Sequence, residues 1–248
     1  LELARMQELI TRTIPPPPAT VLDIGGGPGR YAAWLAREGY EVHLIDAVSL
    51  HIAQAEAASN KQPGTPIASI QLGNARALPF EEEFGSAVLL HGPLYHLTER
   101  EDRLRALREA WRVLKPGGRL LAVAVSRYAS TLVGFQRWWL EHADYQQMLD
   151  EELASGRHEP PDNWPGLFTT AHFHRPEELE EEIETAGFSL KEILAVHGPG
   201  WIAPEPHAIM ADPLKREALL KTIRKIEREP AILGMSPHIM AVAEKLET

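Results

Sequence analysis

A glycine-rich loop is the strongest chemical feature of the sequence. The loop at 25–29 reads Gly-Gly-Gly-Pro-Gly, between a short apolar run at 20–24 and a segment with helical periodicity at 30–38. Glycine lets the backbone turn sharply and approach a ligand closely. A strand, a glycine loop and a helix in this order predict a binding site for a nucleotide-type ligand.

Three ligand classes compete for this loop. A phosphate-cradling loop requires Gly-Lys followed by Ser or Thr, which the sequence lacks here. A dinucleotide loop requires Gly-x-Gly-x-x-Gly, but Arg30 stands at the third glycine position counted from Gly25 and Gly27. What remains is an Asp-x-Gly-x-Gly-x-Gly loop that begins at Asp23. Asp46, at the end of the second predicted strand, suits ribose hydroxyls in either of the last two cases.

Four histidines lie where the sequence places the mouth of this site. His91 and His96 follow the fourth predicted strand, and His172 and His174 precede a later helix. Because ligands of open α/β sheets bind beyond the carboxyl ends of the strands, the loop with His91, Tyr95 and His96 should line the reaction centre. An imidazole titrates in the range that a general base requires. Each histidine could instead be structural, by capping a helix or holding an insertion to the sheet.

Strand and helix patterns alternate along most of the chain, which predicts an α/β fold with a parallel, doubly wound sheet. Residues 115–118, Lys-Pro-Gly-Gly, predict a helix stop and a turn. The predicted strands are 20–24, 41–45, 67–72, 86–90, 120–125, 189–196 and 237–245. The predicted helices are 1–13, 30–38, 48–60, 98–114, 175–186 and 212–229, the last with Leu214, Leu219, Ile223 and Ile226 as its buried stripe.

Composition narrows the function classes. The 248 residues include 25 Lys+Arg and 35 Asp+Glu, a formal net charge of -10, which argues against a general nucleic-acid binder. The absence of cysteine excludes disulfides, Cys-zinc sites, iron–sulfur clusters and thiol catalysis. No segment is apolar enough for a membrane span, and the first residues do not resemble a signal peptide. We expect a cytoplasmic protein, and since the sequence does not begin with Met, native N-terminal residues could be missing.

The chain resembles the class I S-adenosylmethionine (SAM) dependent methyltransferases. The resemblance is strong over about residues 19–126 and looser over 172–197 and 234–245. It rests on the order and spacing of the glycine loop at 21–31, the loop at 73–80, the helix, turn and strand at 107–121, and the segment 172–188. It implies a Rossmann-like, seven-stranded sheet, mostly parallel with the last strand antiparallel, and SAM as the cofactor.

The resemblance also implies a set of cofactor residues. Asp23 and the loop amides would serve the methionine part, Asp46 the ribose, and Asn74 the adenine, where family members often carry Asp. The structural alternative is that Asp23 only orders the loop and Asp46 only caps the next helix. The implied cofactor-binding residues are Asp23, Gly25, Gly26, Gly27, Gly29, Tyr31, Asp46, Ala47, Asn74, Ala75, Arg76 and His91.

For catalysis the candidates are His96, His91, Tyr95 and His174, with His96 first, and we expect no metal. The leading hypothesis is an enzyme that transfers the SAM methyl group to a small-molecule acceptor, by O- or N-methylation. The alternatives are an RNA methyltransferase, a non-catalytic SAM-binding or dimerisation module, and an NAD(P)-linked oxidoreductase, which Arg30 disfavours.

We interpret the chain as one methyltransferase domain, 1–248, that exists as a monomer or homodimer. It comprises an N-terminal helix (1–14), a SAM-binding core (19–126), a mostly helical lid insertion over the sheet edge (127–172) and the C-terminal part of the core (173–248). The tryptophans Trp138, Trp139, Trp164 and Trp201 fit an aromatic acceptor pocket or, equally, the core of the insertion itself.

Overall fold

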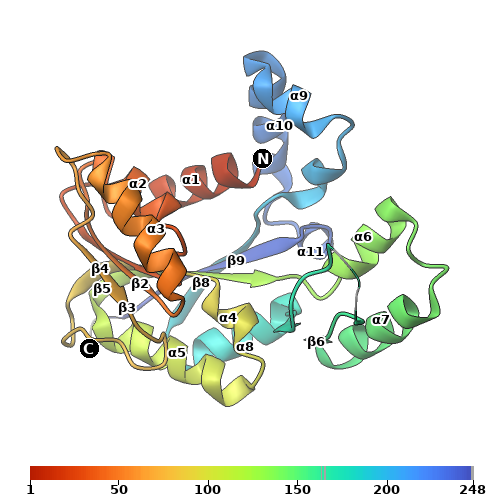
Figure 1. Ribbon diagram of the computed structural model, residues 1–248, viewed down its shortest axis with the longest axis horizontal. Coiled ribbons are helices and arrows are strands. Elements are labelled where there is room, and N and C mark those ends of the chain that lie inside the picture. The colour runs from red at the N-terminus through yellow and green to blue at the C-terminus, as the bar shows by residue number, and fades with distance from the viewer. Residues whose placement is uncertain (163, 165, 247–248) are drawn as a thin grey trace.

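Short runs of buried aliphatic residues form one central sheet of seven strands (Figure 1). The computed structural model describes residues 1–162, 164 and 166–246. The strands are β1 (Thr20–Ile24), β2 (Glu41–Asp46), β3 (Ser69–Leu72), β4 (Gly85–His91), β5 (Leu114–Val125), β8 (Ser189–Ala195) and β9 (His238–Glu244).

The strand order is β3-β2-β1-β4-β5-β9-β8. The strands from β1 to β5 pair in parallel, whereas β9 runs antiparallel to both β5 and β8. The predicted fold class, a mostly parallel doubly wound sheet with an antiparallel last strand, is confirmed. The order reverses between β1 and β4, so a crevice is expected beyond the carboxyl ends of these two strands.

Helices cover both faces of the sheet and bury two apolar layers against it. In Figure 1, α1 (Glu2–Thr13), α2 (Arg30–Arg37) and α3 (Ser49–Asn60) lie above the sheet, and α5 (Arg100–Val113) and α8 (Pro176–Thr185) lie below it. The remaining core elements are α4 (Pro93–His96), the 3-10 turn Gly198–Ile202, α9 (Pro206–Ala211), α10 (Pro213–Ile226) and α11 (Pro230–Leu233). Within the part of the chain that the structure describes, no helix combines the length and apolar character that a membrane span requires.

The stretch 127–172 contains two helices and projects from one end of the sheet (Figure 1). It contains α6 (Ala129–Arg137), α7 (Ala143–Ser155) and a small antiparallel pair, β6 (Arg157–His158) with β7 (Ala171–His172). Residues 163 and 165 of this stretch, and 247–248 of the predicted C-terminal part, lie outside the described residues.

Two local expectations are wrong. The turn predicted at Lys115–Gly118 is a bulge inside β5, because Gly117 donates to the carbonyl of Lys245 at 2.7 Å and the register against β4 shifts there. Leu214, predicted as buried, is 84% exposed. The first turn of α10 extends beyond the sheet beside α9, so that only Leu220 and Ile223 of this helix are buried.

Candidate active site

The glycine loop between β1 and α2 folds back onto the end of β2. The N–H groups of Gly25 and Gly26 both donate to the carbonyl oxygen of Ile45, at 2.8 and 3.3 Å. The N–H of Gly29 donates to the carbonyl of Gly26 at 3.1 Å, which closes the turn into α2. These bonds hold the loop at the point where the strand order reverses.

Asp46 connects this loop to the start of α3. Its Oδ2 accepts a hydrogen bond from the Gly27 N–H at 2.8 Å, and its Oδ1 accepts from the Val48 N–H at 2.9 Å and lies 3.0 Å from His51 Nδ1. A carboxylate offers about four acceptor positions on its two oxygens, so a further donor can still bind. Ordering the loop and binding a ligand hydroxyl are therefore compatible roles for Asp46.

A cavity of about 620 Å³ opens beside the loop and Asp46, within the usual size range of small-molecule sites. The predicted site residues that line it are Gly25, Gly27, Asp46, Ala47, Asn74, Ala75, Arg76, His91, Tyr95 and His96. Its walls also include Gly73, Gly92, Pro93 and Leu97, which lie in loops predicted to line the site, and Ile45, Val48 and His51, which were not predicted.

The short helix α4 lines this cavity and lies close to Phe168, a residue of a second, apolar cavity of about 290 Å³. Tyr95 and His96 line the first cavity, and their rings lie 5.7 and 5.6 Å from the ring of Phe168, which lines the second. The second cavity is lined by Val125, Ala129, Ser130, Val133, Tyr145, His158, Gly166, Leu167, Phe168, Phe173, Pro237 and His238.

Known proteins match both the core and the whole fold. The methyltransferase domain family matches residues 22–122. A protein named ubiquinone/menaquinone biosynthesis C-methyltransferase UbiE, from Pectobacterium carotovorum, is 40% identical over 112 residues, which are 43% of this chain and 43% of that protein. A demethylmenaquinone methyltransferase from Roseiflexus castenholzii is 30% identical over 176 residues, covering 71% of this chain and 70% of the relative. The chain belongs to the class I SAM-dependent methyltransferases.

The same family appears among solved structures. A SAM-dependent methyltransferase from Methanosarcina mazei superposes with a TM-score of 0.66 at 21% identity, over 97% of this chain and 98% of the other, which shows a shared fold. The chain spans less than half the length of the Pectobacterium relative. The cofactor of this methyltransferase is SAM, as the sequence analysis expects.

The residues around the cavity of about 620 Å³ fit SAM. A side chain built at Gly27 would meet nothing within 4 Å, so the loop backbone faces open space that a ligand can fill. Asp46 supplies an acid for ribose hydroxyls. Asn74 uses its Oδ1 for the N–H and Nε of Arg76, at 3.0 and 3.1 Å, so its amide NH₂ is the group that would face adenine.

Asp23, Gly26, Gly29 and Tyr31 do not line either cavity, although all four were predicted to bind the cofactor. Asp23 is fully buried beneath the loop, and a Cβ at Gly26 would lie 2.7 Å from its Oδ2. Neither of its carboxylate oxygens has a hydrogen-bond partner within the described chain. Burial is the largest influence and raises the pKa of Asp23 to about 7; the Ala32 backbone opposes it, and the charge of Asp46 adds a smaller rise.

This raised pKa predicts that Asp23→Asn changes how stability depends on pH. Below the unfolded pKa both states of Asp23 are protonated; as pH rises toward about 7 only the unfolded state loses its proton, so the native state loses stability. Asn cannot ionise and removes this loss. The stability of the variant relative to wild type should therefore increase by about 2–3 kcal/mol between about pH 5 and about pH 8 in ligand-free urea unfolding. The exposed Asp150→Asn should show no such trend, and a pH-independent difference for Asp23→Asn would contradict the assignment.

Gly25 is constrained both by its backbone conformation and by its neighbour Pro93. Its φ is +75°, and a Cβ there would lie 2.5 Å from Cδ of Pro93, the rigid residue that begins α4. Gly25→Ala should therefore destabilise the protein by about 2–4 kcal/mol, from backbone strain plus overpacking, and should lower SAM affinity by displacing α4. Gly64→Ala, where nothing lies within 4 Å, is the matched control. Equal unfolding midpoints for the two variants would contradict this prediction, because they would show that Pro93 moves aside without a loss of stability.

The four catalytic candidates lie in different surroundings. Burial lowers the pKa of His91 and His96, and raises that of Tyr95 to about 12. His174 is buried away from both cavities, where its Nε2 lies 3.2 Å from Glu182, which is also paired with Arg103. The structure therefore brings His91, Tyr95 and His96 together and leaves His174 in a structural network.

Sequence reasoning missed a cluster formed by Glu2, His91, His197 and His238. Glu2 Oε1 lies 3.7 Å from His91 Nε2 and 3.8 Å from His238 Nδ1, and its Oε2 lies 3.7 Å from His197 Nε2. The pKa of Glu2 is lowered to about 2, with His197 as the largest cause, and burial lowers the pKa of His238 to about 4. The available signal was that His91, His197 and His238 all lie at strand ends on one edge of the sheet.

The tryptophans of the insertion do not line either cavity. Trp139 and Trp164 pack around Tyr145, at 5.6 Å each, as the core of the insertion, and Trp138 is 66% exposed. Trp201 donates to the carbonyl of Met235 at 2.9 Å, outside the insertion. Of the two alternatives that the sequence left open, the structure supports the insertion core for Trp139 and Trp164, and neither alternative for Trp138 and Trp201.

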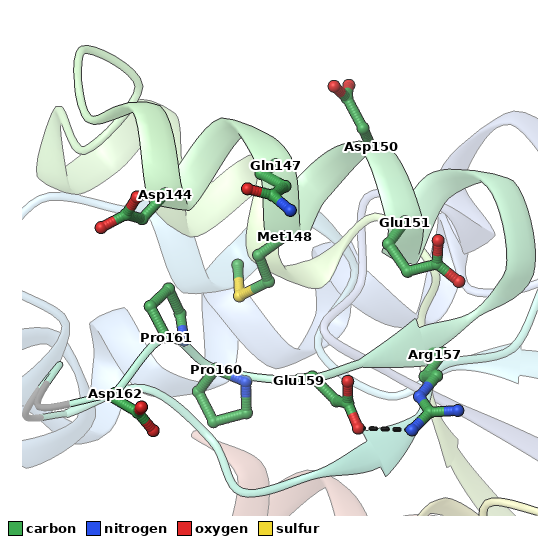
Figure 2. A pocket seen from close by; sticks show the side chains of 10 residues that line it. All are labelled: Asp144, Gln147, Met148, Asp150, Glu151, Arg157, Glu159, Pro160, Pro161 and Asp162. Atoms are coloured by element: carbon green, nitrogen blue, oxygen red, sulfur yellow. Dashed lines mark hydrogen bonds and ion pairs between the residues drawn. The ribbon is translucent and has the colours of Figure 1, made fainter.

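The insertion carries an open groove of about 940 Å³ between α7 and the segment that follows it (Figure 2). Figure 2 shows α7 on one side and the segment 157–162 on the other, with Asp150 pointing away and Arg157 paired to Glu159 at 2.6 Å. Five of the ten residues that line the groove are acidic: Asp144, Asp150, Glu151, Glu159 and Asp162.

Proposed function

We propose that this protein transfers the SAM methyl group to a carbon or oxygen atom of a small, apolar, hydroxylated ring. The apolar cavity close to the cofactor cavity carries this proposal, because Tyr95 and His96 line the cofactor cavity and their rings lie 5.7 and 5.6 Å from Phe168 of the apolar cavity. Aromatic walls favour a flat ring as the occupant.

One edge of the apolar cavity is polar and would orient the acceptor. Ser130 Oγ and His158 Nδ1 both lie 2.7 Å from Glu152 Oε2, and His158 Nε2 lies 3.2 Å from the carbonyl of Phe168. An acceptor hydroxyl or carbonyl group at this edge would meet fixed hydrogen-bonding groups rather than water.

The chemistry requires removal of one proton for each methyl group gained. When bound, SAM supplies an electrophilic methyl group. Ionisation of a ring hydroxyl makes both its oxygen and the neighbouring ring carbon nucleophilic. His96 is the proposed proton acceptor, since burial lowers its pKa and keeps the imidazole neutral near pH 7. Tyr95 would align the ring beside it.

The names of the relatives support carbon as the acceptor atom. One relative is named a C-methyltransferase of ubiquinone/menaquinone biosynthesis and the other a demethylmenaquinone methyltransferase. The sequence analysis favoured O- or N-methylation, and an amine acceptor has less support because both named relatives and the apolar cavity favour a ring. The acidic groove on the insertion argues against RNA, whose phosphates would be repelled there.

A product assay tests this proposal. Purified protein is incubated with SAM and, separately, dihydroxybenzene, dihydroxynaphthalene, a small primary amine and a short RNA. We expect S-adenosylhomocysteine and a product one CH₂ unit heavier only with the hydroxylated rings, and NMR of that product distinguishes carbon from oxygen methylation. Turnover only with the amine or the RNA would overturn the proposal, as would tight S-adenosylhomocysteine binding without any methylated ring.

A further inference from the structure

We propose that Glu2, His197 and His238, with His91 as a fourth ligand, form a site for a divalent transition metal ion, with Zn²⁺ as the best match. Nothing in the sequence alone pointed to a metal. The ligand atoms of Glu2, His197 and His238 all lie within 4.8 Å of one another. The site departs from the sequence-based expectation of no metal.

The spacing of the donor atoms is close to that of a bound ion. Zn–N and Zn–O bonds of about 2.0–2.2 Å place tetrahedral ligands roughly 3.3–3.5 Å apart. Glu2 Oε1 lies 3.7 Å from His91 Nε2 and 3.8 Å from His238 Nδ1, and Glu2 Oε2 lies 3.7 Å from His197 Nε2. Glu2, His197 and His238 are therefore close to ligand spacing, and His91, which is outside this group of three, would join them by a rotation of its side chain. Three imidazoles and one carboxylate suit Zn²⁺ and neighbouring first-row metals rather than Mg²⁺ or Ca²⁺.

An unpartnered donor atom also points to a ligand. Nδ1 of His238 is buried and has no hydrogen-bond partner within the described residues, although it faces the Glu2 carboxylate at 3.8 Å. A buried polar atom without a partner is costly unless something occupies the space in front of it. A metal ion between these side chains would satisfy it.

The backbone around the cluster is fixed on both sides. Ser236 Oγ accepts from the His197 N–H at 3.0 Å and donates to the His238 carbonyl at 2.6 Å, which ties the two ligand-bearing segments together. Arg5, one turn after Glu2, is fully buried; it donates to the Val196 carbonyl at 2.9 Å and pairs with Glu227 at 2.5 Å. These bonds hold α1 so that Glu2 faces the histidines, in the way that hydrogen bonds to the neighbours of metal ligands orient those ligands.

The position of the cluster indicates what a bound ion would do. His91 lines the cofactor cavity and His238 lines the apolar cavity, and their rings are 6.1 Å apart. An ion here would stand at the junction of the two cavities. If the proposed function holds, its positive charge would attract and orient the ionised hydroxyl of the acceptor.

Metal binding can be measured without SAM or acceptor. Chelator-treated protein is titrated with ZnCl₂ by calorimetry and with CoCl₂ by visible spectroscopy. We expect one saturable Zn²⁺ site and the d–d absorption of four-coordinate Co²⁺. Glu2→Gln and His238→Gln should each lower Zn²⁺ affinity at least about 100-fold, at or beyond the upper end of the loss usual for an outer-shell partner. His207→Gln, an exposed histidine on α9, is the matched control.

The outcomes separate this site from the proposed function. S-adenosylhomocysteine binding and circular dichroism verify that each variant is folded. The metal proposal fails if wild type shows no saturable Zn²⁺ binding, or if His207→Gln weakens it as much as His238→Gln does. Zn²⁺ binding without methyl transfer to rings would overturn the proposed function and leave the metal site in place.

Discussion

Asp46→Asn is expected to weaken S-adenosylhomocysteine binding by about 10- to 100-fold. The two carboxylate oxygens of Asp46 accept from the N–H groups of Gly27 and Val48, at 2.8 and 2.9 Å. An amide has one acceptor oxygen and one NH₂ donor, so in either orientation one of these N–H groups faces another donor. An unpaired donor that is shielded from water costs about 1–3 kcal/mol, which is about 5- to 150-fold in affinity when the loop must order on binding. Both N–H groups are partly buried, so the expected loss lies inside that range. Calorimetric titration of both proteins measures the difference.

A modified ligand separates the two roles of Asp46. If Asp46 also binds ribose hydroxyls, wild type should prefer S-adenosylhomocysteine over its 2′-deoxy analogue, and Asp46→Asn should lose that preference. If Asp46 only orders the glycine loop, the variant should weaken both ligands equally. Asp150→Asn, on the exposed side of α7, should bind like wild type. Affinity of Asp46→Asn within about twofold of wild type would exclude both roles.

The cofactor side of the site was predictable from the sequence because it follows a topological rule. The loop at 25–29, Asp46 and Asn74 each follow one strand of a parallel sheet, so the alternation of elements alone brings them to the same edge. The alternation does not determine how deeply each side chain is buried. Asp23 precedes the loop by two residues and was expected to face the ligand, yet its alternate position on β1 puts it beneath Gly26.

The Glu2 cluster depends on contacts between distant parts of the chain, which no local pattern encodes. β9 lies between β5 and β8, and this strand order brings His238 beside His197, with ring centroids 5.5 Å apart. The apolar period of α1 predicts a buried face, but it does not reveal that Arg5 is buried on that face against Glu227. The orientation of Glu2 follows from that ion pair, so the sequence could not reveal it.

The insertion at 127–172 shows a third reason why the sequence does not determine which residues form the site. Its aromatic residues predict burial, but burial against one another and burial around a substrate have the same composition. Trp139 and Trp164 pack on Tyr145, whereas Phe168 and Phe173 line the apolar cavity. Residue type alone does not separate these two pairs of side chains.

His96→Gln is expected to lower kcat for a hydroxylated ring by about 10²- to 10⁴-fold, the range for loss of a general base. His96 lines the cofactor cavity, and its ring lies 5.6 Å from Phe168 of the apolar cavity, so the acceptor hydroxyl that loses its proton would lie between these two rings. Gln keeps a polar side chain of similar length but cannot accept a proton near neutral pH. The fall should therefore appear in kcat rather than in the KM for SAM. His207→Gln should retain wild-type kcat.

The pH profile distinguishes a base from a residue that only shapes the wall. A general base is active when neutral, and burial is the larger influence on His96, so its pKa lies below the usual 6.5 even with the opposing charge of Asp46. Wild-type kcat should therefore be constant at neutral pH and fall only once the solution is more acidic than that pKa. The acidic limb should disappear in His96→Gln, because the group that titrates has been removed. A large loss of kcat with the limb unchanged would assign His96 to positioning the acceptor and the proton to another group.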